Sequence, residues 1–566
     1  MGITASLRVP PRARKLQAGV AATVLLALAG LLVTILVLGL AGTLSRQQEA
    51  DRQTGEALAR AKSALLGYAT AYPERQGSGN DQFGYQPCPD TVVSVIPEGN
   101  EESACGARDV TSIGRLPWKT LGLPALRDSA NECLWYAVSG NFKSGTKSHL
   151  LNWDSNALIE VLAPDGTTRL AGSSPTNRAA AVIFGPGAVL PGQDRSTVSG
   201  TTTCGGNYTG SNYLDSDTAS GINNATPSTT ANALSSVIAA LNSDQVADPN
   251  HNFNDRLIFI TAEEIWREVA KRSDFVSRLA DADTGVLGFA ANCLAQQALA
   301  NSNQFSWAAP VALTNYHPDA NYASQSGALV GRLPNVLGSC PGWANVEWFW
   351  KNWKDHFFYA VAEPYQPGSP NSTQPNPCDF GECLTVDGDG PYAAILIFAG
   401  ERRDAQSRNT NANYTSPEKG DPANYLEGEN LAAFLASGPG DADWGIFSRT
   451  AGNDILVTVC ADSTLSVNQP CSASPPPTNC ESDGLLLLSY QDSSDPKQNN
   501  CKNPDGKGPK EEAIQECKDI RDRIKGNCKK KCRDAAEDFI KKPCIDNLDD
   551  KKCTPVMNEL ASCEPK

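Results

Sequence analysis

Five short sequence blocks occur twice in this 566-residue chain, in the same order each time. Each block of the first half recurs about 200 to 220 residues later, and the pairs begin at Gly114 and Gly331, Leu134 and Phe357, Ala179 and Tyr392, Asn212 and Asn424, and Phe253 and Gly452. One match of this kind would be chance, but five matches in register indicate an internal duplication. The sequence therefore predicts two tandem copies of one folding unit.

Each copy combines helical patterns with short strand patterns. Continuous apolar runs of the length typical of buried strands cover residues 180–184, 257–260, 393–398 and 455–459. Amphipathic or apolar helical patterns precede them at residues 56–72, 262–279 and 288–301. This order predicts an α+β fold, in which helices pack on an antiparallel sheet in each unit.

The N-terminal region carries a membrane-anchor pattern. A basic leader precedes an uncharged run from Val20 to Leu44, which is 25 residues and long enough to span a bilayer as a helix. Basic residues before the run, with Glu49 and Asp51 after it, predict a cytoplasmic N-terminus. We therefore expect a single-pass membrane protein with most of the chain outside the cytoplasm.

The helix is expected to continue beyond the membrane, because no proline interrupts the sequence between Pro11 and Pro73. Apolar residues at spacings of three and four, including Leu58, Ala61 and Leu65, form one stripe along this second part. Such a stripe is predicted to pack either on the chain's own globular part or on identical helices in an assembly.

The sequence KLQAGVAATVLL at residues 15–26, followed by a long apolar and then amphipathic helix, resembles the N-terminus of type IV pilin-like proteins. The resemblance implies cleavage by a prepilin peptidase after Gly19, a mature N-terminus at Val20, and contacts with other pilin-like subunits through the N-terminal helix. It also implies an anchor in the bacterial inner membrane, with the bulk of the chain in the periplasm or on an extracellular filament. Major pilins have glutamate at the fifth mature position, where this chain has Val24. In lacking this glutamate, the chain is similar to certain minor subunits, notably the large K-type pseudopilin of type II secretion.

The cysteine content fits an exported protein. There are 18 cysteines, an even number that suggests disulfides in an oxidising compartment. The candidates for disulfide bonding are Cys88, Cys105, Cys378, Cys383, Cys517, Cys528, Cys532, Cys544, Cys553 and Cys563. Zinc is the competing interpretation for two closely spaced pairs, Cys378 with Cys383 and Cys528 with Cys532, but neither has a nearby histidine or a second CxxC pair.

Together these patterns predict the domain organisation. The segments are a basic leader (1–19), a transmembrane and stalk helix (20–73), a first α+β unit (74–261), connecting helices with a second α+β unit (262–471), a proline-rich linker (472–479) and a disulfide-rich α-helical tail (480–566).

The sequence offers little that could carry out chemistry. The net charge of −15 argues against a nucleic-acid partner, and the chain lacks the common nucleophile, zinc-protease, phosphate-binding and dinucleotide motifs. Asp255 and Asp454 occupy equivalent points of the two copies and are predicted to cap turns or strand ends. We therefore predict a protein that is not an enzyme and needs no cofactor.

Two binding sites are predicted. An aromatic cluster of Trp343, Trp348, Trp350 and Trp353 could bind a sugar or peptide, although clustered tryptophans more often belong to the core. Asp387 and Asp389 have the spacing of calcium ligands, although the rest of a calcium loop is missing.

These observations favour a pilin-like minor subunit, at the tip of or priming a type IV pilus or type II secretion pseudopilus, with an adhesive or binding role. The alternative is an unprocessed, membrane-anchored periplasmic protein that binds a polysaccharide or peptide through its aromatic cluster.

Overall fold

The computed structural model describes residues 46–75, 82–91, 96–147, 150–240, 253–374, 376–403, 405–409 and 416–469, with the single positions 31, 471, 524, 530, 534 and 536. Gly19, Val20, nearly all of the predicted membrane segment and nearly all of the tail from residue 480 lie outside these residues. Among the described helices, none combines the length and the apolar character that crossing a membrane requires.

The first unit is built on a mixed sheet of seven strands. These are β1 (Ser112–Arg115), β2 (Trp135–Val138), β3 (Ile159–Leu162), β4 (Arg169–Ala171), β5 (Ala179–Gly185), β6 (Ser235–Ile238) and β7 (Arg256–Thr261). The fully buried β5 pairs antiparallel with β2, β3 and β7, and β2 pairs in turn with β1. The parallel pair is β3 with β6.

The second unit repeats this arrangement with six strands. These are β8 (Val330–Arg332), β9 (Phe357–Val361), β10 (Leu384–Val386), β11 (Asp389–Phe398), β12 (Ile446–Phe447) and β13 (Ile455–Cys460). Here β11 pairs antiparallel with β9, β10 and β13, β9 pairs with β8, and β10 pairs in parallel with β12. Every pairing of the first sheet except that of β4 therefore has its counterpart, which confirms the predicted pair of repeated sheet units.

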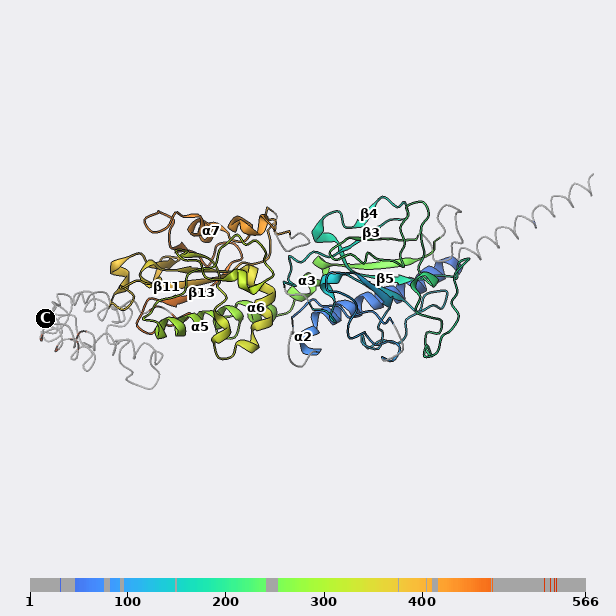
Figure 1. Cartoon of the computed structure of the whole chain (residues 1–566), viewed down its shortest axis with the longest axis horizontal. Coiled ribbons are helices and arrows are strands. Elements are labelled where there is room, and N and C mark those ends of the chain that lie inside the picture. The colour runs from blue at the N-terminus through green and yellow to red at the C-terminus, as the bar shows by residue number, and fades with distance from the viewer. Residues whose placement is uncertain are drawn as a thin grey trace, which may run out of the picture.

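A helix backs each sheet (Figure 1). Residues 46–70 form the N-terminal helix, whose predicted apolar stripe is buried at Ala57, Leu58, Ala61 and Leu65 in the same core as β5 and β7. In the second unit, α5 (Val286–Ala300) packs against β11 and β13. The apolar stripe that includes Leu58, Ala61 and Leu65 thus packs on the chain's own globular part, one of the two partners expected for it.

The segment predicted as one helix at 262–279 is instead two helices, α3 (Ala262–Ala270) and α4 (Phe275–Ala280). Thr261 and Glu264 form a capping box that starts α3. The helix is interrupted at residues 271–274, where the Asp274 carboxylate accepts hydrogen bonds from Arg272 and Arg278. Serine and aspartate, which stand at 273 and 274, are weak helix formers. Arg272 also donates to the Thr70 carbonyl of the N-terminal helix, so a tertiary contact holds the turn.

The remaining helices are α2 (Tyr72–Arg75), α6 (Glu347–Trp353) and α7 (Gly428–Leu435). One hydrophobic core contains residues of the N-terminal helix, of α3 to α6 and of both sheets. The two units therefore meet through a shared apolar interior, in which α6 contributes Trp350 and Trp353.

Five disulfides join cysteines of the described chain: Cys88–Cys105, Cys133–Cys204, Cys293–Cys340, Cys378–Cys383 and Cys460–Cys471. The four candidates from the two α+β units are thus bonded, as Cys88 with Cys105 and Cys378 with Cys383. The six tail candidates, Cys517, Cys528, Cys532, Cys544, Cys553 and Cys563, lie outside the described residues.

Candidate functional site

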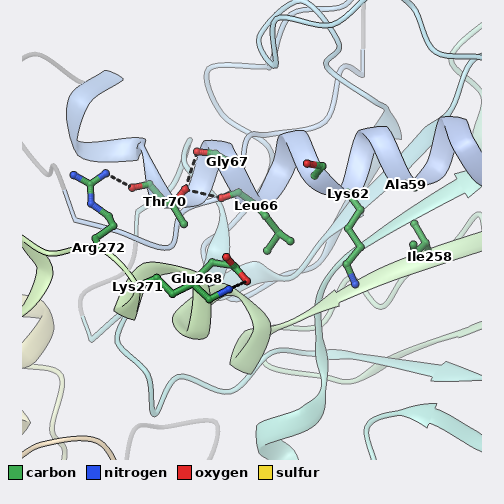
Figure 2. Close-up of a pocket in the computed structure, with 10 residues that line it drawn as sticks. Ala59, Lys62, Leu66, Gly67, Thr70, Ile258, Glu268, Lys271 and Arg272 are labelled. Carbon is green, nitrogen blue, oxygen red and sulfur yellow. Dashed lines mark hydrogen bonds and ion pairs between the residues drawn. The ribbon is translucent and has the colours of Figure 1, made fainter.

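The first candidate is an open groove of about 610 Å³ between the N-terminal helix and the elements β7 and α3 (Figure 2). The helix contributes one wall with Ala59, Lys62, Ser63, Leu66, Gly67 and Thr70. Ile258 of β7 and Glu268, Lys271 and Arg272 at the end of α3 form the other wall. The groove lies between these elements because α3 starts directly after β7 and lies beside the N-terminal helix.

One exposed stripe of the N-terminal helix consists of small residues. Gly55, Ala59, Ser63 and Gly67 recur every four residues, and all four are exposed. A Cβ atom added at Gly55 or Gly67 would have no heavy atom within 4 Å. Because small side chains allow two helix backbones to approach closely, this face is suited to packing against a second helix.

The charges in the groove are paired. Lys62 Nζ lies 2.7 Å from the Glu264 carboxylate, and Lys271 Nζ lies 2.6 Å from that of Glu268. Arg272 donates to the Thr70 carbonyl at 3.0 Å and pairs with Glu74. With its cations neutralised in this way, the groove offers a contact surface rather than an anion site.

A second feature is a buried arginine that recurs in both units. Arg195 donates to the Asn212 carbonyl at 2.8 Å, the Gly187 carbonyl at 2.9 Å and the Gln193 side chain at 2.8 Å. Arg408 makes the equivalent bonds to Asn424, Gly400 and Gln406. The repeated Gln-x-Arg sequence at 193–195 and 406–408 is thus a sixth repeat block, which the sequence comparison missed.

Each arginine lies near a buried aspartate, Asp255 in the first unit and Asp454 in the second. In the first unit, Asp255 accepts from the backbone N–H of Asp215 at 2.8 Å and from Asn224 at 2.9 Å. In the second unit, Asp454 accepts in the same way from Glu427 and Asn430. These bonds tie each loop to the start of a strand, which is the capping role predicted for both aspartates.

Burial changes the pKa values of these acids. It raises the pKa of Asp215 to about 6 and that of Asp454 to about 7. For Asp255, burial and the negative charge of the neighbouring Asp215 both act, and they raise its pKa well above the usual value. A raised pKa can mark a general acid. However, Asp215, Asp255 and Asp454 are 4%, 0% and 5% exposed, so these side chains are closed to a substrate in this structure.

A third cluster lies where the units meet. Within the described ranges, Asp154, Asp355 and His356 form the only group of three potential metal ligands. His356 lies between the two carboxylates, 2.9 Å from Asp154 and 3.0 Å from Asp355. Lys419 pairs with Asp355, and Arg408 lies 3.7 Å from Asp154.

These cations decide the charge state of the cluster. Burial alone would raise the pKa of Asp154, but Arg408 and His356 outweigh it and lower the pKa to about 2. Likewise, Lys419 and His356 outweigh burial and hold the pKa of Asp355 well below its usual value. Because protein cations already compensate both carboxylates, the cluster is better suited to joining the two units than to binding a metal.

The four predicted tryptophans differ in exposure, although Trp343 and Trp350 pack edge-to-face at a centroid distance of 5.6 Å. Trp350 and Trp353 are fully buried, whereas Trp343 and Trp348 are half-buried. Trp353 packs edge-to-face on Trp153 at a centroid distance of 4.8 Å. The four rings therefore do not form one exposed platform.

The two predicted calcium ligands lie at the turn between β10 and β11. The Asp387 carboxylate accepts hydrogen bonds from the Ser448 hydroxyl at 2.7 Å and from the Arg449 backbone N–H at 3.1 Å. Asp389 is exposed at the first position of β11. Calcium binding at this turn remains a prediction.

Comparison with known proteins adds no relative to this description. No family model, no curated protein and no solved structure matches the chain.

Proposed function

We propose that this chain is a membrane-anchored, exported pilin-like minor subunit, which acts at the tip of, or primes, a type IV pilus or a type II secretion pseudopilus. The observation that carries the proposal is the division of the N-terminal helix into two faces. One face is buried on the first sheet, and the other exposes Gly55, Ala59, Ser63 and Gly67 beside the groove. This second face is available to the helix of a neighbouring subunit.

The duplication supports a position at the end of a filament. A single N-terminal helix precedes two α+β units, and β1 to β7 and β8 to β13 form two sheets (Figure 1). A subunit with such a large exported part is hard to repeat along a thin filament, but an end position leaves space for it.

The described side chains favour this proposal over a periplasmic binding protein. That alternative depends on an accessible aromatic cluster, and two of its four rings, Trp350 and Trp353, are fully buried. Asp215, Asp255 and Asp454, whose pKa values are raised, are buried as well, so these acids do not support an enzymatic role.

Replacing Ala59 with leucine tests the helix face. The side chain is exposed, so the free energy of unfolding should change by less than about 0.5 kcal/mol. A bulky residue at the contact should reduce recovery of the chain in sheared filament fractions by about tenfold, equivalent to ~1.4 kcal/mol. The measurement is an immunoblot of filaments against total membrane.

Ala300→Leu is the matched control, because Ala300 is an exposed alanine at the end of α5, the corresponding helix of the second unit. It should leave filament recovery unchanged. Equal recovery of the Ala59→Leu and wild-type chains would contradict the proposed contact face.

A further inference from the structure

The two units differ at one edge of their sheets. The sequences Asn254-Asp255 and Asn453-Asp454 align β7 with β13, so that Phe259 corresponds to Thr458 and Thr261 to Cys460. Each strand pairs along one edge with the central strand of its sheet, β5 or β11. The opposite, outer edges can therefore be compared group by group.

In the second unit, the chain itself covers the outer edge of β13. Val467 forms an antiparallel bridge with Val459, the Asn468 N–H donates to the Thr458 carbonyl at 2.8 Å, and the Cys460 N–H donates to the Ser466 carbonyl at 2.8 Å. The Cys460–Cys471 disulfide closes this loop. An extended segment thus occupies the edge as an additional short strand.

In the first unit, two side chains bind the equivalent backbone groups of β7. Lys62 Nζ donates to the Phe259 carbonyl at 2.9 Å, and the Thr261 N–H donates to the Glu264 carboxylate at 3.0 Å. The two side chains also pair with each other at 2.7 Å. Lys62 thus takes the place of the Asn468 N–H, and Glu264 takes that of the Ser466 carbonyl.

No segment of the described chain pairs with this edge as residues 466–468 pair with β13. The chain enters α3 immediately after Thr261, so it cannot fold back along the strand. The groove shown in Figure 2 lies beside the edge, with Lys62 and Ile258 among its lining residues. Space for a further segment is therefore present.

We propose that the outer edge of β7 is a strand-binding site, which accepts an extended peptide segment of another polypeptide antiparallel to β7. The segment displaces the Lys62–Glu264 pair and supplies the N–H and C=O groups that Asn468 and Ser466 supply to β13. Addition of a strand to an open sheet edge is an established mode of peptide recognition. The inference goes beyond the proposed function, because it requires neither cleavage at Gly19 nor incorporation into a filament.

The occupant is expected to resemble the segment that covers β13. That segment, Leu465-Ser466-Val467-Asn468, is uncharged and alternates apolar and polar residues. Lys62 and Glu264 are 23% and 29% exposed, and an ion pair this accessible adds little net stability. Its displacement by backbone hydrogen bonds is therefore feasible.

The test uses the full chain in detergent and a labelled synthetic peptide with the sequence of residues 463–470. Fluorescence anisotropy should show binding to the wild-type chain and about tenfold tighter binding to a Lys62→Met variant, which lacks the competing donor. Hydrogen exchange should show that the peptide increases protection of the Thr261 amide, because this N–H then donates to a backbone carbonyl of the peptide in place of the Glu264 carboxylate. Exchange within β13 should not change, which separates the two edges.

Two controls make the result specific. Lys271→Met removes a groove lysine that pairs with Glu268, so its affinity for the peptide should equal that of the wild type. A peptide N-methylated at the position of Asn468 lacks the essential donor and should not bind. If Lys62→Met does not fold, Glu264→Gln serves instead, because glutamine can keep the helix cap while the ion pair is lost.

The proposal is overturned if the folded variant and the wild type both fail to bind the peptide at about 1 mM. Equal binding of the N-methylated peptide would overturn it as well.

Discussion

Replacing Trp353 with alanine is expected to lower the free energy of unfolding by about 3–5 kcal/mol. The ring is fully buried and packs against Trp153 and Trp266 of the first unit and the connecting helices, at centroid distances of 4.8 and 5.5 Å. It also contacts Phe398 of β11 at 6.0 Å. Its removal would leave a cavity at the point where both units share one core, and urea denaturation of the full chain measures the loss.

Trp348→Ala is the control on the same helix, α6. This ring is half-buried and lies under Lys351 at 5.0 Å, so its truncation should cost only about 1 kcal/mol. Equal losses for the two variants would show that Trp353 does not join the units as described.

Replacing Lys419 with methionine should destabilise the protein by about 3–5 kcal/mol at pH 8, because it leaves the buried Asp355 carboxylate without its principal cation. In the wild type, the lowered pKa of Asp355 means that this group stabilises the fold above its ordinary pKa of about 3.9 and loses that contribution as the pH falls. The wild type therefore keeps nearly all of this contribution down to about pH 4. In the variant, burial without Lys419 raises the pKa of Asp355, so the carboxylate takes up a proton and sheds its uncompensated charge as the pH falls. The deficit, measured by urea denaturation at several pH values, should therefore shrink toward pH 4.

The double variant Lys419→Met with Asp355→Asn provides the control. Asparagine carries no charge and retains an oxygen that can accept from Asn152, as Asp355 does at 3.0 Å. Most of the lost stability should return. A deficit of the same size at pH 4 and pH 8, or no recovery in the double variant, would exclude the compensated charge as the reason for the effect.

The duplication and the α+β class could be predicted because they rest on strong local patterns. The apolar runs at 180–184 and 393–398 became the central strands β5 and β11, and the runs at 257–260 and 455–459 became their neighbours β7 and β13. The strand pairing itself was not predicted. It depends on contacts between distant segments, such as β3 with β6, for which the sequence carries no local signal.

The break between α3 and α4 was not predicted either, since the apolar spacing continues across it. The turn contains the weak helix formers Ser273 and Asp274 and is held by the bond of Arg272 to Thr70, a tertiary contact that a pattern of apolar residues does not report.

The sites were less accessible to sequence reasoning than the fold. The apolar stripe of the N-terminal helix was predicted, but the groove beside its other face depends on where α3 lies. The cluster of Asp154, Asp355 and His356 joins residues about 200 positions apart. Both units contribute to it, so it is not a repeated feature that a comparison of the two copies could detect. The difference between the outer edges of β7 and β13 emerged only from comparing equivalent backbone groups.

The central claim is most directly tested by N-terminal sequencing of the mature protein from its native membrane, with a Gly19→Val variant beside it. The pilin-like proposal predicts that the wild-type chain starts at Val20 and that this start is lost in the variant. A start at Met1, or a start after Gly42, would contradict it.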